Sequence, residues 1–250
     1  MTDNKIIYLF KGLIHPERAT LSIEEPIKSM VIHQSTKKEL EIELSIRNNQ
    51  LTIWITTNEE WDIFDLRNIA RHYSNTYCSV LTFTIGHYYT VEIIQILCKK
   101  LNIDYVFGID VECISKRSSL DFFANNFKKV LASTTGELGV FIARCLMDLR
   151  TALENSEDTA FHCYRSIESL RQYVKVKYNI NDKNDEKSWA KLWEISSYNR
   201  EYIKVIESKS GLIRHGNIGL IDIGENRADY LLITWNVVED FIKKECLHLD

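Results

Sequence analysis

The first half of the chain carries the alternation of apolar and polar positions that is typical of β-strands. The alternation runs through residues 40–46, is interrupted by the polar turn residues 47–50, and resumes at residues 51–55. This spacing predicts a β-hairpin, in which Trp54 lies on the outer face and needs cover of its own. The residues expected to face a core are Leu40, Ile42, Leu44 and Ile46.

From Asp62 onward, apolar residues recur at spacings of three and four, which predicts one long helix that ends near Gly86. Asn58, which precedes a group of acidic residues, is the expected N-cap. Residues 90–97 and 105–109 are rich in β-branched and aromatic side chains, so two further strands are expected there. The N-terminal part is therefore predicted to be a small antiparallel sheet with one helix packed on it.

After a polar stretch at residues 115–119, strand patterns stop and helical spacing continues to the C-terminus. The predicted fold class is α+β, with an α+β domain at 1–115 followed by an all-α helical bundle at 116–250. Gly136 and Gly139 interrupt the first helical region without abolishing it. The expected helices cover residues 120–134, 137–154, 157–177, 186–196, 198–214 and 226–247.

Composition and charge exclude some classes of protein for this chain. The 250 residues are 45% hydrophobic, and the net charge is −4. All of that negative charge lies within residues 1–113, and residues 114–250 are neutral, so neither half resembles a basic surface that binds nucleic acid through bulk charge. Any RNA contact is expected to be local. No apolar run is long enough for a membrane span and the first residues lack a secretory signal, which predicts a cytoplasmic protein without membrane contact.

The residues that commonly hold metals or cofactors are scattered. The six cysteines include no Cys-x-x-Cys pair, and the seven histidines include no His-x-x-x-His pair. The glycines form neither a phosphate-binding loop nor a dinucleotide fingerprint, and Gly-x-Ser-x-Gly is absent. No metal and no cofactor is expected.

The last third of the chain holds the candidate chemistry. Tyr164, Arg165 and Glu168 fall on one predicted helix, and Lys209, Arg214 and His215 close another, just before Gly216 and Asn217. One interpretation is a site for RNA chemistry. The other is structural, because cations and a left-handed glycine commonly finish a helix, and Arg165 with Glu168 at i,i+3 can be a simple surface ion pair.

The Tyr-Arg-x-x-Glu helix and the terminal Arg-His-Gly resemble those of the HEPN superfamily, in its prokaryotic branch. This resemblance covers the helical region, just over half of the chain. It implies a helical bundle that commonly forms homodimers, often in bacterial antiviral defence or toxin–antitoxin systems. Many members are metal-independent ribonucleases, in which the RNA 2′-hydroxyl attacks the adjacent phosphate with the help of a histidine and an arginine.

Carried over to this chain, His215 matches the motif histidine, but Lys209 occupies the position where the motif has arginine. Lysine keeps the positive charge but lacks the planar guanidinium group, which forms bidentate hydrogen bonds to a phosphate. Arg214 can supply that group, although adjacent helical residues point about 100° apart. The resemblance assigns substrate binding to Tyr164, Arg165, Glu168 and Asn217.

Two hypotheses remain open from the residues. The first is a homodimeric, metal-independent endoribonuclease or RNA-binding protein in which His215 acts as acid or base. The second is a non-catalytic dimeric interaction or sensor module that docks on a protein partner, which the acidic first half and the lysine at position 209 favour.

Overall fold

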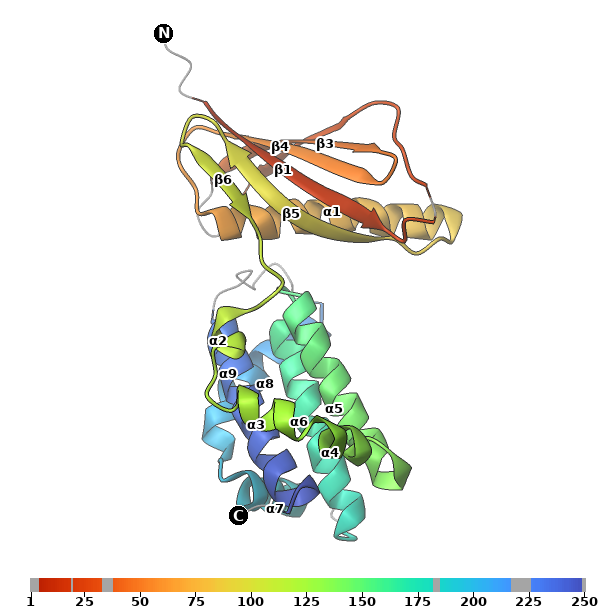
Figure 1. Ribbon diagram of the computed structural model, residues 1–250, viewed down its shortest axis with the longest axis vertical. Helices are drawn as coiled ribbons and strands as arrows, with labels where there is room; N and C mark the ends of the chain where they lie inside the picture. The colour runs from red at the N-terminus through yellow and green to blue at the C-terminus, as the bar shows by residue number, and fades with distance from the viewer. Residues whose placement is uncertain (1–4, 19, 33–37, 182–184, 217–225, 249–250) are drawn as a thin grey trace. The chain divides into compact units, whose positions relative to one another are not determined.

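The computed structural model describes residues 5–18, 20–32, 38–181, 185–216 and 226–248 (Figure 1). The chain divides into two compact units, Met1–Ile109 and Asp110–Asp250, which we name the N-terminal domain and the helical domain. The division precedes the predicted boundary at 115/116 because helix α2 (Glu112–Ser115), one turn long, belongs to the second unit. Its Ile114 is buried in a core cluster of the helical domain. The α+β fold class is confirmed, with a sheet domain followed by helices.

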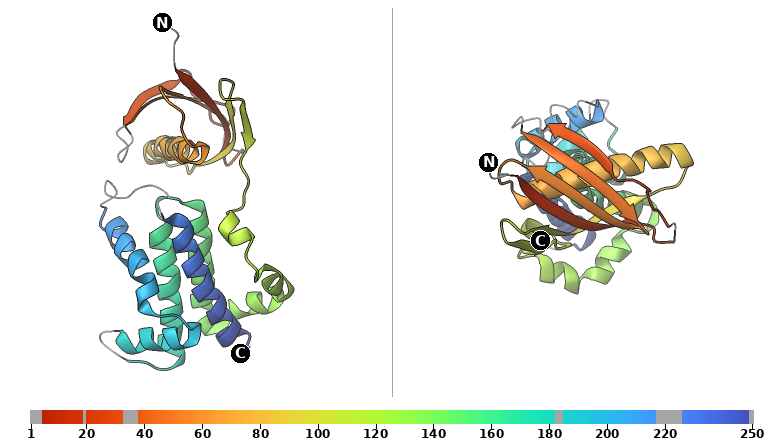
Figure 2. Two further views of the ribbon diagram at one scale, coloured as in Figure 1. Left: turned by 90° about the vertical axis from the view of Figure 1, so that its left-hand side faces the viewer. Right: turned by 90° about the horizontal axis from the view of Figure 1, so that it is seen from above.

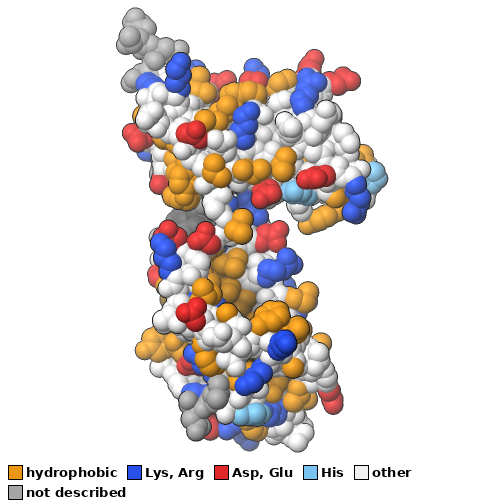
Figure 3. All heavy atoms as spheres, viewed as in Figure 1, with side chains coloured by type: hydrophobic (Ala, Val, Ile, Leu, Met, Phe, Trp, Pro, Cys, Tyr) orange, Lys and Arg blue, Asp and Glu red, His pale blue; other side chains and the backbone are white. Residues whose placement is uncertain are grey.

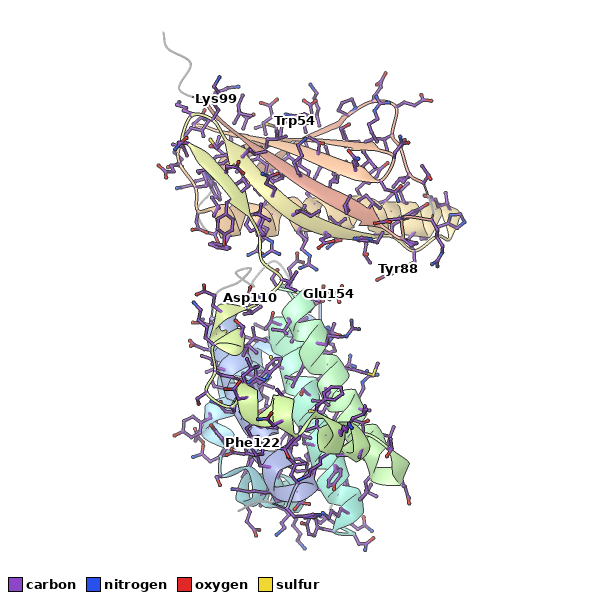
Figure 4. The ribbon with its side chains drawn as sticks, viewed as in Figure 1. Trp54, Tyr88, Lys99, Asp110, Phe122 and Glu154 are labelled. Carbon is purple, nitrogen blue, oxygen red and sulfur yellow. The ribbon has the colours of Figure 1, made fainter. Side chains whose placement is uncertain are left out.

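A six-stranded antiparallel sheet forms the N-terminal domain, with the strand order β2-β3-β4-β1-β5-β6. The strands are β1 (Ile6–His15), β2 (Ile27–Ile32), β3 (Glu39–Arg47), β4 (Gln50–Thr57), β5 (Thr90–Cys98) and β6 (Ile103–Val106). The predicted hairpin is confirmed as β3 and β4, and its four inward side chains are fully buried. Trp54 is half-buried on the outer face (Figure 4).

Helix α1 (Ile63–Ile85) covers one face of this sheet, which curves around it in Figure 2. Asp62 is the N-cap, since its side chain accepts hydrogen bonds from the backbone N–H groups of Phe64 and Asp65 at 2.8 and 3.1 Å. The expected N-cap at Asn58 is therefore wrong, because the acidic residues after it precede the helix. The predicted stop at Gly86 is confirmed by its left-handed φ of 72°.

The helical domain surrounds α6, which packs against α5, α7, α8 and α9. After α2, the helices of this domain are α3 (Leu120–Asn125), α4 (Phe127–Ser133), α5 (Gly136–Glu154), α6 (Thr159–Lys177), α7 (Glu186–Ser196), α8 (Arg200–Arg214) and α9 (Arg227–Phe241). A π-helical turn, η2 (Ile242–Cys246), replaces the end of the helix expected at 226–247. The helix expected at 120–134 is broken at Asn126, which caps both α3 and α4.

Two glycines inside helices provide a matched test of the packing. A Cβ added at Gly139 in α5 would lie 2.5 Å from the backbone carbon of Thr134, whereas one added at Gly211 in α8 would have nothing within 4 Å. We expect Gly139→Ala to lower the free energy of unfolding by roughly 1–3 kcal/mol, because the chain before α5 must move. Gly211→Ala should raise it by up to about 1 kcal/mol, since alanine is the better helix former. Urea unfolding followed by far-UV circular dichroism measures both, and a stabilised Gly139→Ala variant would contradict this packing.

No single helix among the described residues has the length and apolar character to cross a bilayer; α4 and α5, which bend by 113° at their junction, reach that composition only as a pair.

Candidate functional site

The residues with predicted catalytic roles lie along the last two turns of α8. The helix is held in the core by Ile203, Ile206 and Ser210. At its end, the backbone N–H of His215 donates to the carbonyl of Gly211 at 3.1 Å, and Gly216 adopts a left-handed φ of 75°. The predicted stop at Gly216 is confirmed, and it leaves the side chains of Arg214 and His215 exposed to solvent.

The cations of α8 occupy two different faces of the helix. Because successive residues turn by about 100°, Glu207 and Arg214 share one face, whereas Lys209 points about 140° away from Arg214. Lys209 is half-buried and shares its side of the helix with the exposed Tyr202 and Val205. The structure thus separates Lys209 from Arg214 within one chain.

Tyr164 reaches from α6 to α8. Its hydroxyl donates to Oε1 of Glu207 at 3.2 Å, and Nη2 of Arg200 lies 3.3 Å from the same oxygen. Burial, reinforced by the carboxylates of Glu207 and Glu168, raises the pKa of Tyr164. The phenol therefore stays protonated near neutral pH and acts as a hydrogen-bond donor.

Glu168 lies one turn further along α6 than Tyr164. Burial raises the pKa of its carboxyl group, while the guanidinium groups of Arg171 and Arg214 lower it in part. That attraction places Arg214 within electrostatic range of Glu168. Tyr164, Glu168 and Arg214 consequently form one neighbourhood between α6 and α8, with Glu207 as its fourth member.

The raised pKa of Glu168 predicts how stability changes with pH. A raised carboxyl pKa means that the ionised form is disfavoured in the folded chain, so ionisation costs stability above the folded pKa and nothing below the unfolded one. We expect Glu168→Gln to raise the free energy of unfolding at pH 7 by less than about 1 kcal/mol, and the gain to vanish on acidification. Urea unfolding at several pH values measures it, with Glu201→Gln at an exposed position of α8 as control. A loss of stability at pH 7 would contradict this assignment.

Arg165 turns away from Glu168 and pairs with a residue of another helix. The interpretation of Arg165 and Glu168 as a surface ion pair is therefore wrong. Its Nη2 lies 2.9 Å from Oδ1 of Asp148 on α5, and its guanidinium stacks 5.1 Å from the ring of Phe161. At i,i+3 the two side chains diverge enough for Arg165 to face α5 while Glu168 faces α8. Arg165 is thus bound to a carboxylate, with 27% of its side chain exposed.

Asp148 is the centre of a charged cluster that the sequence did not indicate. Its side chain is only 5% exposed, and it lies between three basic groups. Besides Arg165, Nε of Arg144 lies 3.3 Å from Oδ2, and Nδ1 of His162 lies 3.5 Å from Oδ1. The spacing of Arg144 and Asp148 at i,i+4, and of His162 and Arg165 at i,i+3, places each pair on one helix face. Only the packing of α5 on α6 shows that the two faces meet.

The stacked pair Trp189 and Trp193 belongs to the core of the domain. The ring centroids are 5.2 Å apart with an angle of 15° between planes, and both residues pack against the main cluster. The guanidinium of Arg171 lies 5.1 Å from the Trp189 ring and pairs with Asp185 at 2.6 Å. The pair therefore contributes to the packing of the domain.

The remaining candidate groups are possible metal ligands, the cysteines and Asn217. Among the described residues, no cluster of three or more His, Cys, Asp or Glu side chains could hold a metal ion. The six cysteines are free, and burial raises the pKa of Cys145 and of Cys163 to about 12, so these two thiols stay protonated. Asn217, a predicted substrate contact, lies outside the described residues.

Comparison with known proteins follows the same two-domain division. Residues 8–107 match the N-terminal domain, and residues 127–245 the C-terminal domain, of a family described as a domain of unknown function (DUF8168). No curated protein and no solved structure matches the chain. Each domain is therefore similar to one half of this two-part family, whose description names no activity.

Proposed function

We propose that the protein is a HEPN-like homodimer that acts as a metal-independent endoribonuclease. The observation that carries this proposal is the solvent-exposed pair Arg214 and His215 at the end of α8, a helix that is joined to α6 by the hydrogen bond from Tyr164 to Glu207. The defence or toxin–antitoxin setting and the cytoplasmic location belong to the same proposal and derive from the HEPN resemblance and the sequence.

The proposed chemistry uses groups that a phosphodiester can reach from solvent. His215 accepts the proton of the 2′-hydroxyl as its oxygen attacks the phosphorus. Arg214 stabilises the negative charge that develops on the phosphoryl oxygens. The bond to the 5′-oxygen breaks, and that oxygen takes up a proton, leaving a 2′,3′-cyclic phosphate and a 5′-hydroxyl. Glu168 and Tyr164 act as supports from α6, Tyr164 through its hydrogen bond to Glu207 and Glu168 through its charge.

A homodimer gives Lys209 a place in this proposal. Lys209 lies on the same side of α8 as Tyr202 and Val205, which are 57% and 55% exposed. An exposed tyrosine and an exposed valine on one side of a helix offer an apolar surface that a second copy of the chain can cover. Pairing of two α8 helices along this side would bring Lys209 of each copy to the interface, close to the ends that carry His215.

The test is RNA cleavage by the purified protein with a chelator present. We expect a labelled single-stranded RNA to be cut to products with cyclic phosphate ends, and the same strand with 2′-deoxy sugars to stay intact, because the attacking hydroxyl is then missing. Mass spectrometry of the products distinguishes cyclic from linear phosphate. Complete loss of cleavage in the chelator, or cutting of the deoxy strand, would exclude this mechanism.

A second candidate function is a non-catalytic dimeric module that binds a protein partner. The acidic side chains Glu168 and Glu207 favour it, because carboxylates beside Arg214 repel a phosphate. In this case RNA remains uncut in every buffer, while light scattering still finds a stable dimer. Substitution of Tyr202 and Val205 by serine would then dissociate the dimer.

A further inference from the structure

A cavity of about 280 Å³ lies in the helical domain, and none of the candidate site residues on α6 and α8 lines it. It is enclosed by α5, α9 and the segment that holds α3 and α4, on the side where Figure 4 labels Phe122. Its walls are mainly aliphatic and aromatic, and Figure 3 shows apolar side chains gathered on this face of the domain. The apolar lining includes Val130, Leu146, Leu149, Leu153, Trp235 and Val238.

At one end of the cavity, Arg117 and Glu239 form an ion pair whose charges cancel. Nε of Arg117 lies 2.5 Å from Oε1 of Glu239, and its Nη1 donates to the carbonyl of Ile114 at 2.7 Å. The two side chains are 19% and 10% exposed, and the Arg117 guanidinium also lies 5.7 Å from the Trp235 ring. Because its hydrogen bonds and its charge are already matched within the protein, Arg117 leaves no net charge for a ligand.

Arg150 supplies a second cation at this cavity. It lines the same cavity from α5 and is exposed to solvent. Among the described residues, no ion pair or hydrogen bond joins the side chain of Arg150 to another group. The cavity thus combines an apolar interior with one positive charge in excess, and its guanidinium can grip a carboxylate with two parallel hydrogen bonds.

We propose that this cavity binds a small organic monoanion with an apolar body, such as a medium-chain carboxylate. The carboxylate pairs with Arg150, and the chain lies among Leu146, Leu153 and Trp235. A volume of about 280 Å³ is near the lower limit of small-molecule sites, so the ligand is a compact amphiphile and not a nucleotide or a peptide. The proposal is independent of RNA cleavage and does not involve His215.

The experiment compares three eight-carbon probes on the full chain by calorimetry, with methyl NMR to locate the site. Octanoate should bind, and should shift the methyl signals of Leu146 and Val238. Octanol and octylamine should bind roughly tenfold more weakly, because neither forms the charge-assisted pair with Arg150. Arg150→Gln should remove the preference for octanoate and leave octanol binding unchanged, and Leu146→Trp should block all three probes by filling the cavity.

Lys128→Gln is the matched control, because it removes an exposed positive charge from the same domain, at a residue that does not line the cavity. It should leave the affinity for octanoate unchanged. Failure of octanoate to bind, equal binding of octylamine, or an undiminished preference in Arg150→Gln would each overturn the proposal. If a second copy of the chain fills the cavity instead, octanoate will not bind and Leu146→Trp will convert a dimer to monomers in light scattering.

Discussion

Replacing His215 with alanine is expected to reduce metal-independent RNA cleavage by about a hundredfold or more, the usual contribution of a general acid or base. The side chain is exposed at the end of α8, and its backbone N–H, which donates to Gly211, is kept in the variant. Folding should therefore be unchanged. Initial rates on a labelled RNA, measured with a chelator present, give the effect.

His248 provides the matched control, since it is an exposed histidine in the same domain. His248→Ala should cleave RNA at the wild-type rate, and both variants should have the same melting temperature as wild type. Arg214→Ala should lower the rate as well, because the charge that develops on the phosphate then has no cation beside it. A His215→Ala variant as active as wild type would exclude the imidazole from the reaction, even if the protein still binds RNA.

The elements that were predictable from the sequence are those whose pattern is local. The hairpin β3–β4 alternates cleanly because one of its faces is buried, and α1 shows its buried stripe over 23 residues. Strand β1 lacks this signal, since apolar residues occupy both of its faces. Its position between β4 and β5 depends on pairing with residues far along the chain, which periodicity does not report. Helix α2 is too short to show any period.

The candidate site was predictable to the same extent. The end of α8 could be placed because Gly216 is a local stop signal, and the exposure of His215 follows from that stop. The partners of the site residues could not be placed. Whether Arg165 pairs with Glu168 or with Asp148 is decided by how α5 packs on α6, and the sequence of α6 is equally compatible with both. The same holds for the contact between Tyr164 and Glu207.

Replacing Asp148 with alanine is expected to lower the free energy of unfolding of the helical domain by about 2–3 kcal/mol. The Asp148 side chain is only 5% exposed, and its carboxylate is shared by Arg144, His162 and Arg165. The His162 side chain is also largely buried, at 13% exposed. Removing the buried carboxylate leaves the guanidinium of Arg165, which is 27% exposed, without its partner, and this costs more than losing a surface pair. Urea unfolding followed by far-UV circular dichroism gives the magnitude.

Two further variants separate charge from packing at Asp148. Asp148→Asn keeps the shape and one acceptor oxygen, so its loss of stability should be smaller than that of alanine and should come from the unpaired guanidinium of Arg165. Glu201→Gln breaks an exposed pair with Lys204 in the same domain and should change stability by less than about 1 kcal/mol. If Asp148→Ala costs no more than Glu201→Gln, the cluster does not hold α5 against α6. Arg165 could then exchange Asp148 for a ligand at little cost, which is the role that the HEPN resemblance implies for it.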